Sequence, residues 1–184
     1  GVYAEWMGRD AEIHLSFPAR YEVTLLDRLR PRPPGYTLAL GFPGGGELDP
    51  RQELAQPPIF AVRPEGHPGW VGTFSGGGYG APPAAAPQIV GMPDERSICV
   101  VKHGSACVIR TDDPSSSVEI ELFPVCSALA VLEHRLVVFA DFTRLLAYGA
   151  DGVVWRTDPV VWDDLKLVGY NGDFLRLSGF DAPA

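Results

Sequence analysis

Aspartates gather in the C-terminal half of the chain, where their type and spacing could support chemistry. Among them are Asp112, Asp113, Asp141, Asp151, Asp158, Asp163, Asp164 and Asp181. Paired carboxylates can hydrolyse glycosides or hold a hard cation such as Ca²⁺. The chain has no Asp-x-Asp-x-Asp-Gly loop, so calcium is weakly indicated. Because aspartate also forms and caps turns, the structural role is the favoured interpretation.

A second set of residues combines aromatic rings with an arginine and a carboxylate. The weak binding candidates are Trp70, Tyr79, Arg156, Trp162 and Asp163. Such side chains line grooves for sugars or peptides, and they also pack sheets together. Trp162 follows a proline and is expected at the surface. Trp155 alternates with Val153, so we expect both on one face and Trp155 in the core.

None of the remaining motifs indicates a particular reaction. The four histidines, His14, His67, His103 and His134, are not spaced as a metal pair on one element. The glycine runs at 44–46 and 76–80 lack the lysine and the following helix of a phosphate loop, and no Gly-x-Ser-x-Gly is present. The catalytic residues are therefore unknown, and the sequence predicts no metal and no cofactor.

The composition of the chain narrows the classes of molecule that it could bind. The net charge of −8 and the pI near 4.9 argue against nucleic acid and against anionic membrane surfaces, since both favour a basic face. No apolar run approaches the length of roughly 20 residues that crosses a bilayer. A protein partner or a small polar ligand fits better, and the oligomeric state stays open.

The cysteines and the N-terminus bear on the compartment. The chain has an odd number of cysteines, Cys99, Cys107 and Cys126, which favours free thiols and a reducing compartment. The first ten residues show no signal peptide, although a removed leader stays open. A cytoplasmic location is expected. Thirteen arginines against two lysines, with much Gly, Pro and Ala, suggest a GC-rich bacterial genome.

The elements that would position these residues are β-strands. Beyond residue 97, short apolar runs flank turns at 103–104, 133–135, 150–152 and 170–172, which predicts successive antiparallel hairpins. A two-residue turn at 103–104 would pair Val100 with Cys107 and Cys99 with Val108, and would place the two thiols on opposite faces. A three-residue loop would place them on one face.

The first 96 residues are less regular and rich in Gly and Pro. Strands are expected at 12–17, 36–42, 59–62 and 70–74, while 21–29 fits a strand or a short helical turn. Residues 76–87 read as a long mobile loop. The interpretation is a single domain, 1–184, with an irregular half at 1–96 and a regular hairpin half at 97–181.

A faint internal repeat bears on the architecture. Residues 107–114, CVIRTDDP, recur as VVWRTDP at 153–159, and Arg110 and Arg156 are 46 positions apart. A period in the forties with four strands per unit has the size of a propeller blade. Residues 145–157, a strand, an Asp-Gly turn and an apolar-Trp strand, resemble one repeat of the PQQ-type propeller family. That resemblance covers 13 residues, none of them a cofactor residue, and implies no function.

The fold prediction is all-β: an antiparallel hairpin meander forming a sandwich or a barrel-like structure, with a small propeller-like arrangement of four-stranded units as the alternative. The favoured function is a non-catalytic binding or interaction protein with an aromatic, Gly-rich surface formed by residues 63–87, and by the rim at 156–164. The alternative is a carboxylate-dependent enzyme acting on a carbohydrate or another polar small molecule.

Overall fold

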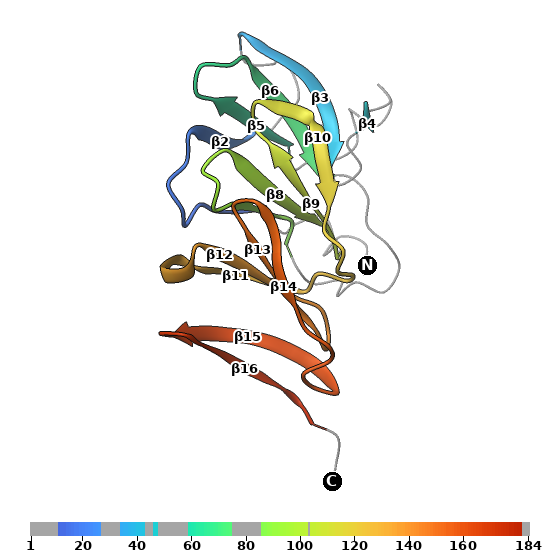
Figure 1. The fold of residues 1–184 in the computed structure, drawn as a ribbon. Helices are drawn as coiled ribbons and strands as arrows, with labels where there is room; N and C mark the ends of the chain where they lie inside the picture. Colours follow the sequence, from blue (N-terminus) through green and yellow to red (C-terminus); the bar gives the residue numbers. More distant parts are fainter. Residues whose placement is uncertain are drawn as a thin grey trace, which may run out of the picture.

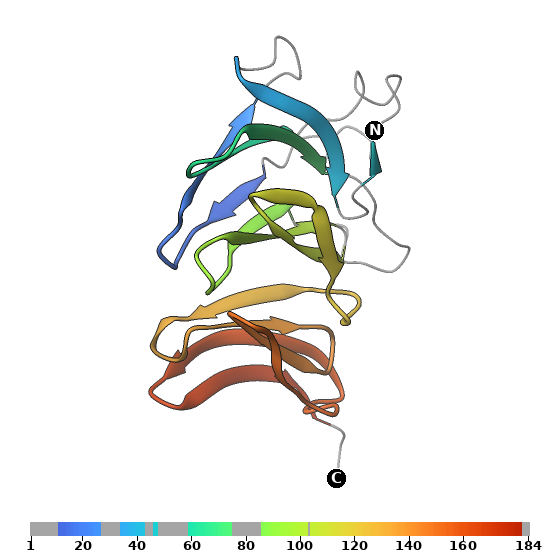
Figure 2. The same cartoon turned by 45° about the horizontal axis from the view of Figure 1, so that its top comes forward.

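Four β-sheets stack face to face, and their order in the stack broadly follows their order in the chain (Figure 1, Figure 2). The computed structural model describes residues 11–26, 34–42, 46–47, 59–74, 86–102 and 104–181. Among these residues the only helical segment is one 3₁₀ turn, Leu132–His134. No described helix is long and apolar enough to cross a membrane.

The first sheet has the strand order β2-β5-β6-β3-β4. Its strands are β2 (Tyr21–Leu26), β3 (Tyr36–Phe42), β4 (Gly46–Glu47), β5 (Ile59–Pro64) and β6 (Gly69–Phe74). The pairing of β3 with β6 is parallel, and its other pairs are antiparallel.

The second sheet has the order β1-β7-β8-β9-β10. Its strands are β1 (Glu12–His14), β7 (Gln88–Gly91), β8 (Ser97–Lys102), β9 (Ser105–Arg110) and β10 (Asp113–Glu119). Because β1 and β7 pair with each other and β7 pairs with β8, this sheet joins the irregular N-terminal part of the chain to the hairpins.

The third sheet and the C-terminal hairpin complete the stack. The third sheet is a four-stranded antiparallel meander of β11 (Ser127–Val131), β12 (Leu136–Ala140), β13 (Leu145–Gly149) and β14 (Gly152–Arg156). The hairpin consists of β15 (Asp163–Asn171) and β16 (Phe174–Phe180), which form a two-stranded sheet.

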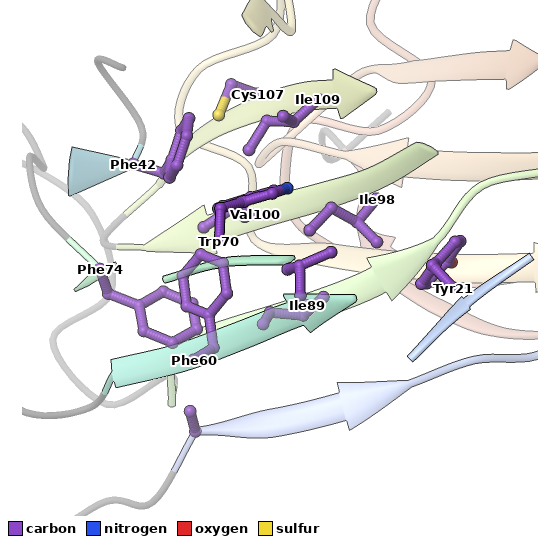
Figure 3. Close-up of a cluster of buried hydrophobic side chains, with 12 residues drawn as sticks. Tyr21, Phe42, Phe60, Trp70, Phe74, Ile89, Ile98, Val100, Cys107 and Ile109 are labelled. Carbon is purple, nitrogen blue, oxygen red and sulfur yellow. The ribbon is translucent and has the colours of Figure 1, made fainter. Parts of the chain in front are cut away.

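Three apolar layers hold the stack together, because alternate residues of the inner strands face opposite neighbours. In β8, Val100 packs against the first sheet, whereas Cys99 belongs to the layer shared with the third sheet. Figure 3 shows the first of these layers, in which Phe60 and Trp70 meet edge to face at 5.9 Å between ring centroids. The third layer lies between the third sheet and the hairpin, where Leu165 is buried.

The all-β, antiparallel prediction is confirmed, and no described sheet closes into a barrel. Residues 21–26 form a strand rather than a helical turn. Strand β10, which follows the hairpin at residue 104, begins at Asp113 and ends at Glu119. Strand β7 was not expected, because its four residues are too few to show a period. The expected loop at 76–87 lies mostly outside the described residues.

The internal repeat corresponds to strands with the same place in successive sheets. Arg110 is the last residue of β9, and Arg156 is the last residue of β14. Strand β9 is the fourth strand of the second sheet when counted from β1, and β14 is the fourth strand of the third sheet when counted from β11. Shifting β7, β8 and β9 by about 46 positions leads to β12, β13 and β14. The repeat therefore relates the third sheet, which has four strands, to four of the five strands of the second sheet.

The cysteines follow the two-residue turn. Val100 pairs with Cys107 and Cys99 with Val108, so the two thiols lie in different core layers. None of the three cysteines, all of which lie in the described part of the chain, forms a disulfide.

Candidate binding surface at the C-terminal hairpin

Hairpin β15–β16 forms because an Asn-Gly turn joins two β-rich segments. Gly172 has a φ of +59°, which a residue with a side chain rarely adopts, and Asn171 pairs with Phe174 to close a two-residue loop. One face of the hairpin packs on the third sheet through Leu165, Leu167, Leu175 and Leu177. The hairpin is thus fixed to the scaffold by one face only.

The C-terminal hairpin and the residue just before it hold the three most exposed large apolar side chains among the described residues. Phe174 is 78% exposed, Phe180 is 66% exposed, and Trp162, just before β15, is 74% exposed. The backbone N–H of Trp162 donates to the carbonyl of Phe180 at 2.7 Å, so these two residues lie side by side. Val168 of β15 adds a fourth exposed apolar side chain. We call these four residues the hairpin patch.

A groove runs between the hairpin and the third sheet. Its volume is about 200 Å³. Its apolar lining is Val131, Leu136, Val138, Trp155, Tyr170, Phe174 and Leu175. At its end, Nε2 of His134 lies 2.9 Å from Oδ1 of Asp173 in the hairpin turn. The groove therefore combines aromatic and aliphatic walls with one ionisable pair at its mouth.

The binding candidates from the sequence separate in space. Trp162 and Asp163 lie beside Phe180, at one end of the hairpin. Arg156 is exposed on the third sheet, where its guanidinium lies 3.3 Å from Glu121. Trp70 is only 2% exposed, and its Nε1–H donates to the carbonyl of Thr111 at 2.8 Å. Trp70 is therefore a core residue and offers no contact area. Tyr79 lies outside the described residues.

The expectation that Val153 and Trp155 share one face is wrong. A bulge in the β13–β14 pairing sets Trp155 opposite Ala147 and Val153 opposite Tyr148, so the two side chains fall on opposite faces. Trp155 faces the hairpin and is half-buried, while Val153 is 44% exposed.

The described aspartates lie mainly at separate turns. Asp141 is buried, and its Oδ1 accepts hydrogen bonds from the backbone N–H groups of Thr143 and Arg144 at 2.8 and 2.6 Å. Asp151 lies in the β13–β14 turn, and Asp158 follows β14. In the described part of the chain, no three His, Cys, Asp or Glu residues are grouped so that they could hold a metal ion.

One polar hollow lies at the end of the first two sheets. It measures about 250 Å³, and its charged or titratable lining is Arg20, Glu65, His67, Arg96 and Asp112. The Arg110 side chain donates to both carboxylate oxygens of Asp112, at 3.0 and 2.9 Å, and this hydrogen bonding lowers the pKa of Asp112. Asp112 is thus held in its ionised form.

Phe174, Phe180 and Val168 are functional candidates that the sequence reasoning missed. Alternation in β16 places Phe174, Arg176 and Phe180 on one face and Leu175 and Leu177 on the other. Apolar residues on both faces of β16 were the available signal, because only one of these faces packs on another described sheet.

Comparison of the chain with models of protein families, with curated proteins and with solved structures finds no match.

Proposed function

We propose that this protein is a non-catalytic binding protein that holds a protein partner on its C-terminal hairpin. The observation that carries the proposal is the hairpin patch: Phe174, Trp162 and Phe180 are the three most exposed large apolar residues of the described chain. Aromatic side chains are enriched at protein interfaces, because they bury much area at little cost in rotamer entropy. Their exposure on a packed hairpin supports a surface that a partner covers.

The scaffold supports this proposal as well. The inner leucines fix the hairpin to the third sheet, so the patch residues are held in place before a partner arrives. Arg176 lies on the same face between the two phenylalanines, and no described residue forms an ion pair with it. An apolar partner surface that carries a carboxylate would match both features.

The test compares two triple variants. Trp162→Ser, Phe174→Ser and Phe180→Ser remove the patch aromatics. The control, Val118→Ser, Leu132→Ser and Val153→Ser, removes exposed apolar residues elsewhere. Proteins captured from an extract of the source organism are identified, purified and titrated by calorimetry against each form.

We expect one purified partner to bind the wild type and the control alike and the patch variant at least about tenfold more weakly, as the loss of interface aromatics implies. Equal binding to all three forms, or no protein that binds the purified wild type, overturns the proposal. Circular dichroism checks that the variants are folded.

A carboxylate-dependent enzyme acting on a carbohydrate or another polar small molecule is the second candidate. The observation in its favour is that Glu65 and Asp112 both line the polar hollow. The lowered pKa of Asp112 suits a base or nucleophile and not a proton donor, so Glu65 would have to be the acid. Glycoside hydrolysis that Glu65→Gln and Asp112→Asn both abolish would favour it, and hydrolysis unaffected by either would reject it.

A further inference from the structure

The polar hollow at the end of the first two sheets is lined by charged side chains from four segments of the chain. Arg20 precedes β2, Glu65 and His67 lie in the turn after β5, Arg96 precedes β8, and Asp112 lies between β9 and β10. The turns after β5 and after β7 lie on the same side of the stack (Figure 2). We propose that this hollow binds an acidic sugar, a ring that carries a carboxylate and several hydroxyl groups. This inference goes beyond the proposed function and does not involve the hairpin patch.

Arg96 is fixed by its backbone, and its side chain is available to a ligand. The carbonyl of Arg96 accepts from the N–H and the Oγ1 of Thr111 at 2.9 and 2.7 Å, and its own N–H donates to Oδ1 of Asp94 at 3.2 Å. No described residue forms an ion pair with its guanidinium. A guanidinium presents paired N–H donors that match the two oxygens of a carboxylate.

Arg20 supplies a second guanidinium to the same hollow. Its backbone N–H donates to the carbonyl of Glu95 at 2.8 Å, and its carbonyl accepts from the N–H of Glu65 at 2.9 Å. Its side chain is 55% exposed, and the ion pair with Glu95 spans 3.8 Å, so solvent weakens this attraction. The guanidinium can therefore exchange this contact for a carboxylate of a ligand.

The carboxylates of the hollow offer acceptors for hydroxyl groups. The side chain of Asp112 is 18% exposed, and both its oxygens accept from the guanidinium of Arg110. An ionised carboxylate has further lone pairs, so a hydroxyl can donate to Asp112 as well. An ammonium group would be repelled at this place by Arg110, which favours a ligand with hydroxyls over an amino acid. Glu65 lines the same hollow and adds a second carboxylate.

His67 contributes one more acceptor. Its Nδ1 lies 3.0 Å from the carbonyl oxygen of Glu65. Because a carbonyl oxygen only accepts, the neutral imidazole carries its proton on Nδ1 and has a lone pair on Nε2. A ligand hydroxyl can donate to this lone pair. The hollow therefore combines two donors of positive charge with three acceptors, which is the complement of an acidic polyol.

The charges around the hollow favour a carboxylate over a phosphate. Glu65 and Asp112 line the hollow, and Glu95 lies beside it against Arg20. These carboxylates repel a ligand anion more strongly the higher its charge. A phosphate group carries about −1.5 to −2 charges at pH 7, whereas a carboxylate carries one. We therefore expect a sugar acid to bind more tightly than a sugar phosphate.

The space fits one sugar with an extension. The volume of about 250 Å³ lies near the lower limit of roughly 300 Å³ for ligand pockets. A wider hollow of about 640 Å³ adjoins it and shares Arg20, Glu65 and His67. The wider hollow adds Arg63 and Glu22, again an arginine with a carboxylate. A second acidic sugar linked to the first would meet the same kinds of group there.

The test titrates the full chain with D-glucuronate and D-galacturonate at pH 7 and follows the backbone amide signals by NMR. We expect at least one of the two to bind with a Kd of about 1 mM, as the usual binding efficiency of small ligands implies. The amides that shift should be those of residues 65–67, 96 and 111–112.

Three further ligands separate the contribution of charge from that of the ring. Glucose and galactose lack the carboxylate, and acetate lacks the hydroxyl groups, so each should bind at least about tenfold more weakly than the better uronate. Glucose 6-phosphate has the ring with a higher charge and should also bind more weakly.

Two variants and a matched control test the residues. Arg96→Gln removes the guanidinium and keeps the backbone hydrogen bonds, so we expect affinity for the better uronate to fall at least about tenfold. Arg20→Gln should lower it at least about threefold. The control Arg176→Gln removes an exposed arginine on β16 and should bind like the wild type. The amide spectrum of each variant shows whether it is folded.

The proposal is overturned when neither uronate binds below about 10 mM, when the shifted amides lie elsewhere, or when the folded arginine variants bind like the wild type. Acetate or glucose 6-phosphate that binds as tightly as the better uronate reveals a general anion site and also overturns it. The triple variant of the hairpin patch should bind the uronate like the wild type. Failure here therefore leaves the protein-binding function untouched, and loss of the protein partner leaves the sugar site untouched.

Discussion

His134 and Asp173 join the third sheet to the C-terminal hairpin at the mouth of the groove, where Nε2 lies 2.9 Å from Oδ1 and forms an ion pair when the imidazole is protonated. Their side chains are 43% and 84% exposed, so solvent weakens the attraction. We expect His134→Ala and Asp173→Asn each to lower the free energy of unfolding by less than about 1 kcal/mol. A double-mutant cycle in urea measures the coupling, which should fade at about 1 M salt. A loss far above this value would show that the pair is buried in solution.

Asp141 should be the aspartate on which stability depends most. It is 3% exposed, it accepts two backbone hydrogen bonds, and Arg144 donates to its Oδ2 at 2.9 Å. Asp141→Ala leaves part-buried donors without their acceptor, so we expect the free energy of unfolding to fall by about 1–3 kcal/mol. Asp151→Ala, at an exposed turn, should change the urea midpoint little. Equal effects of the two variants would contradict the capping role of Asp141.

Cys126 should be a slow nucleophile. Burial, and then the charges of Asp141 and Asp164, raise the pKa of this thiol from 9.0 to about 11. Its thiolate fraction at pH 8 is therefore roughly hundredfold below that of an ordinary thiol. Iodoacetamide labelling followed by mass spectrometry should show a rate that rises up to about pH 11, and Asp164→Asn should raise the rate at pH 8. A plateau near pH 9 would contradict the assignment.

The raised pKa of Cys126 also makes the stability of the folded state depend on pH. The unfolded chain loses the Cys126 proton near its ordinary pKa of 9.0, while the folded chain keeps the proton until about 11. Between these values the folded state binds more protons, so this contribution to stability is present below pH 9 and is lost as the pH rises toward 11. Cys126→Ser should flatten that part of the stability profile measured in urea.

Trp70 should act on stability and not on binding. Trp70→Phe leaves the Thr111 carbonyl without its donor and opens space in the first core layer, so we expect a loss of about 1–3 kcal/mol. Partner affinity, measured by calorimetry where the variant is folded, should match the wild type. A selective loss of affinity would instead return Trp70 to the binding candidates.

Much of the strand content could be predicted from the sequence, because alternation and turn residues are local signals. The turn near Gly104 and the Asn171-Gly172 turn were both predicted, whereas the two-residue loop that sets Cys99 and Cys107 on opposite faces was decided by the structure. Local signals fail where a bulge shifts the period, as it does between Val153 and Trp155.

Tertiary structure decided which faces are covered. Strand β16 carries Phe174 and Phe180 on one face and Leu175 and Leu177 on the other, and its period is the same whichever face packs inward. The leucines are covered because the third sheet lies on their side, through contacts between segments distant in the chain. By itself, the sequence determined where the hairpin turns and most of the strands lie. Packing between sheets decided that Trp70 is core, that Asp141 is a buried cap, and that the last hairpin presents its aromatics to solvent, because burial depends on neighbours that no local pattern encodes.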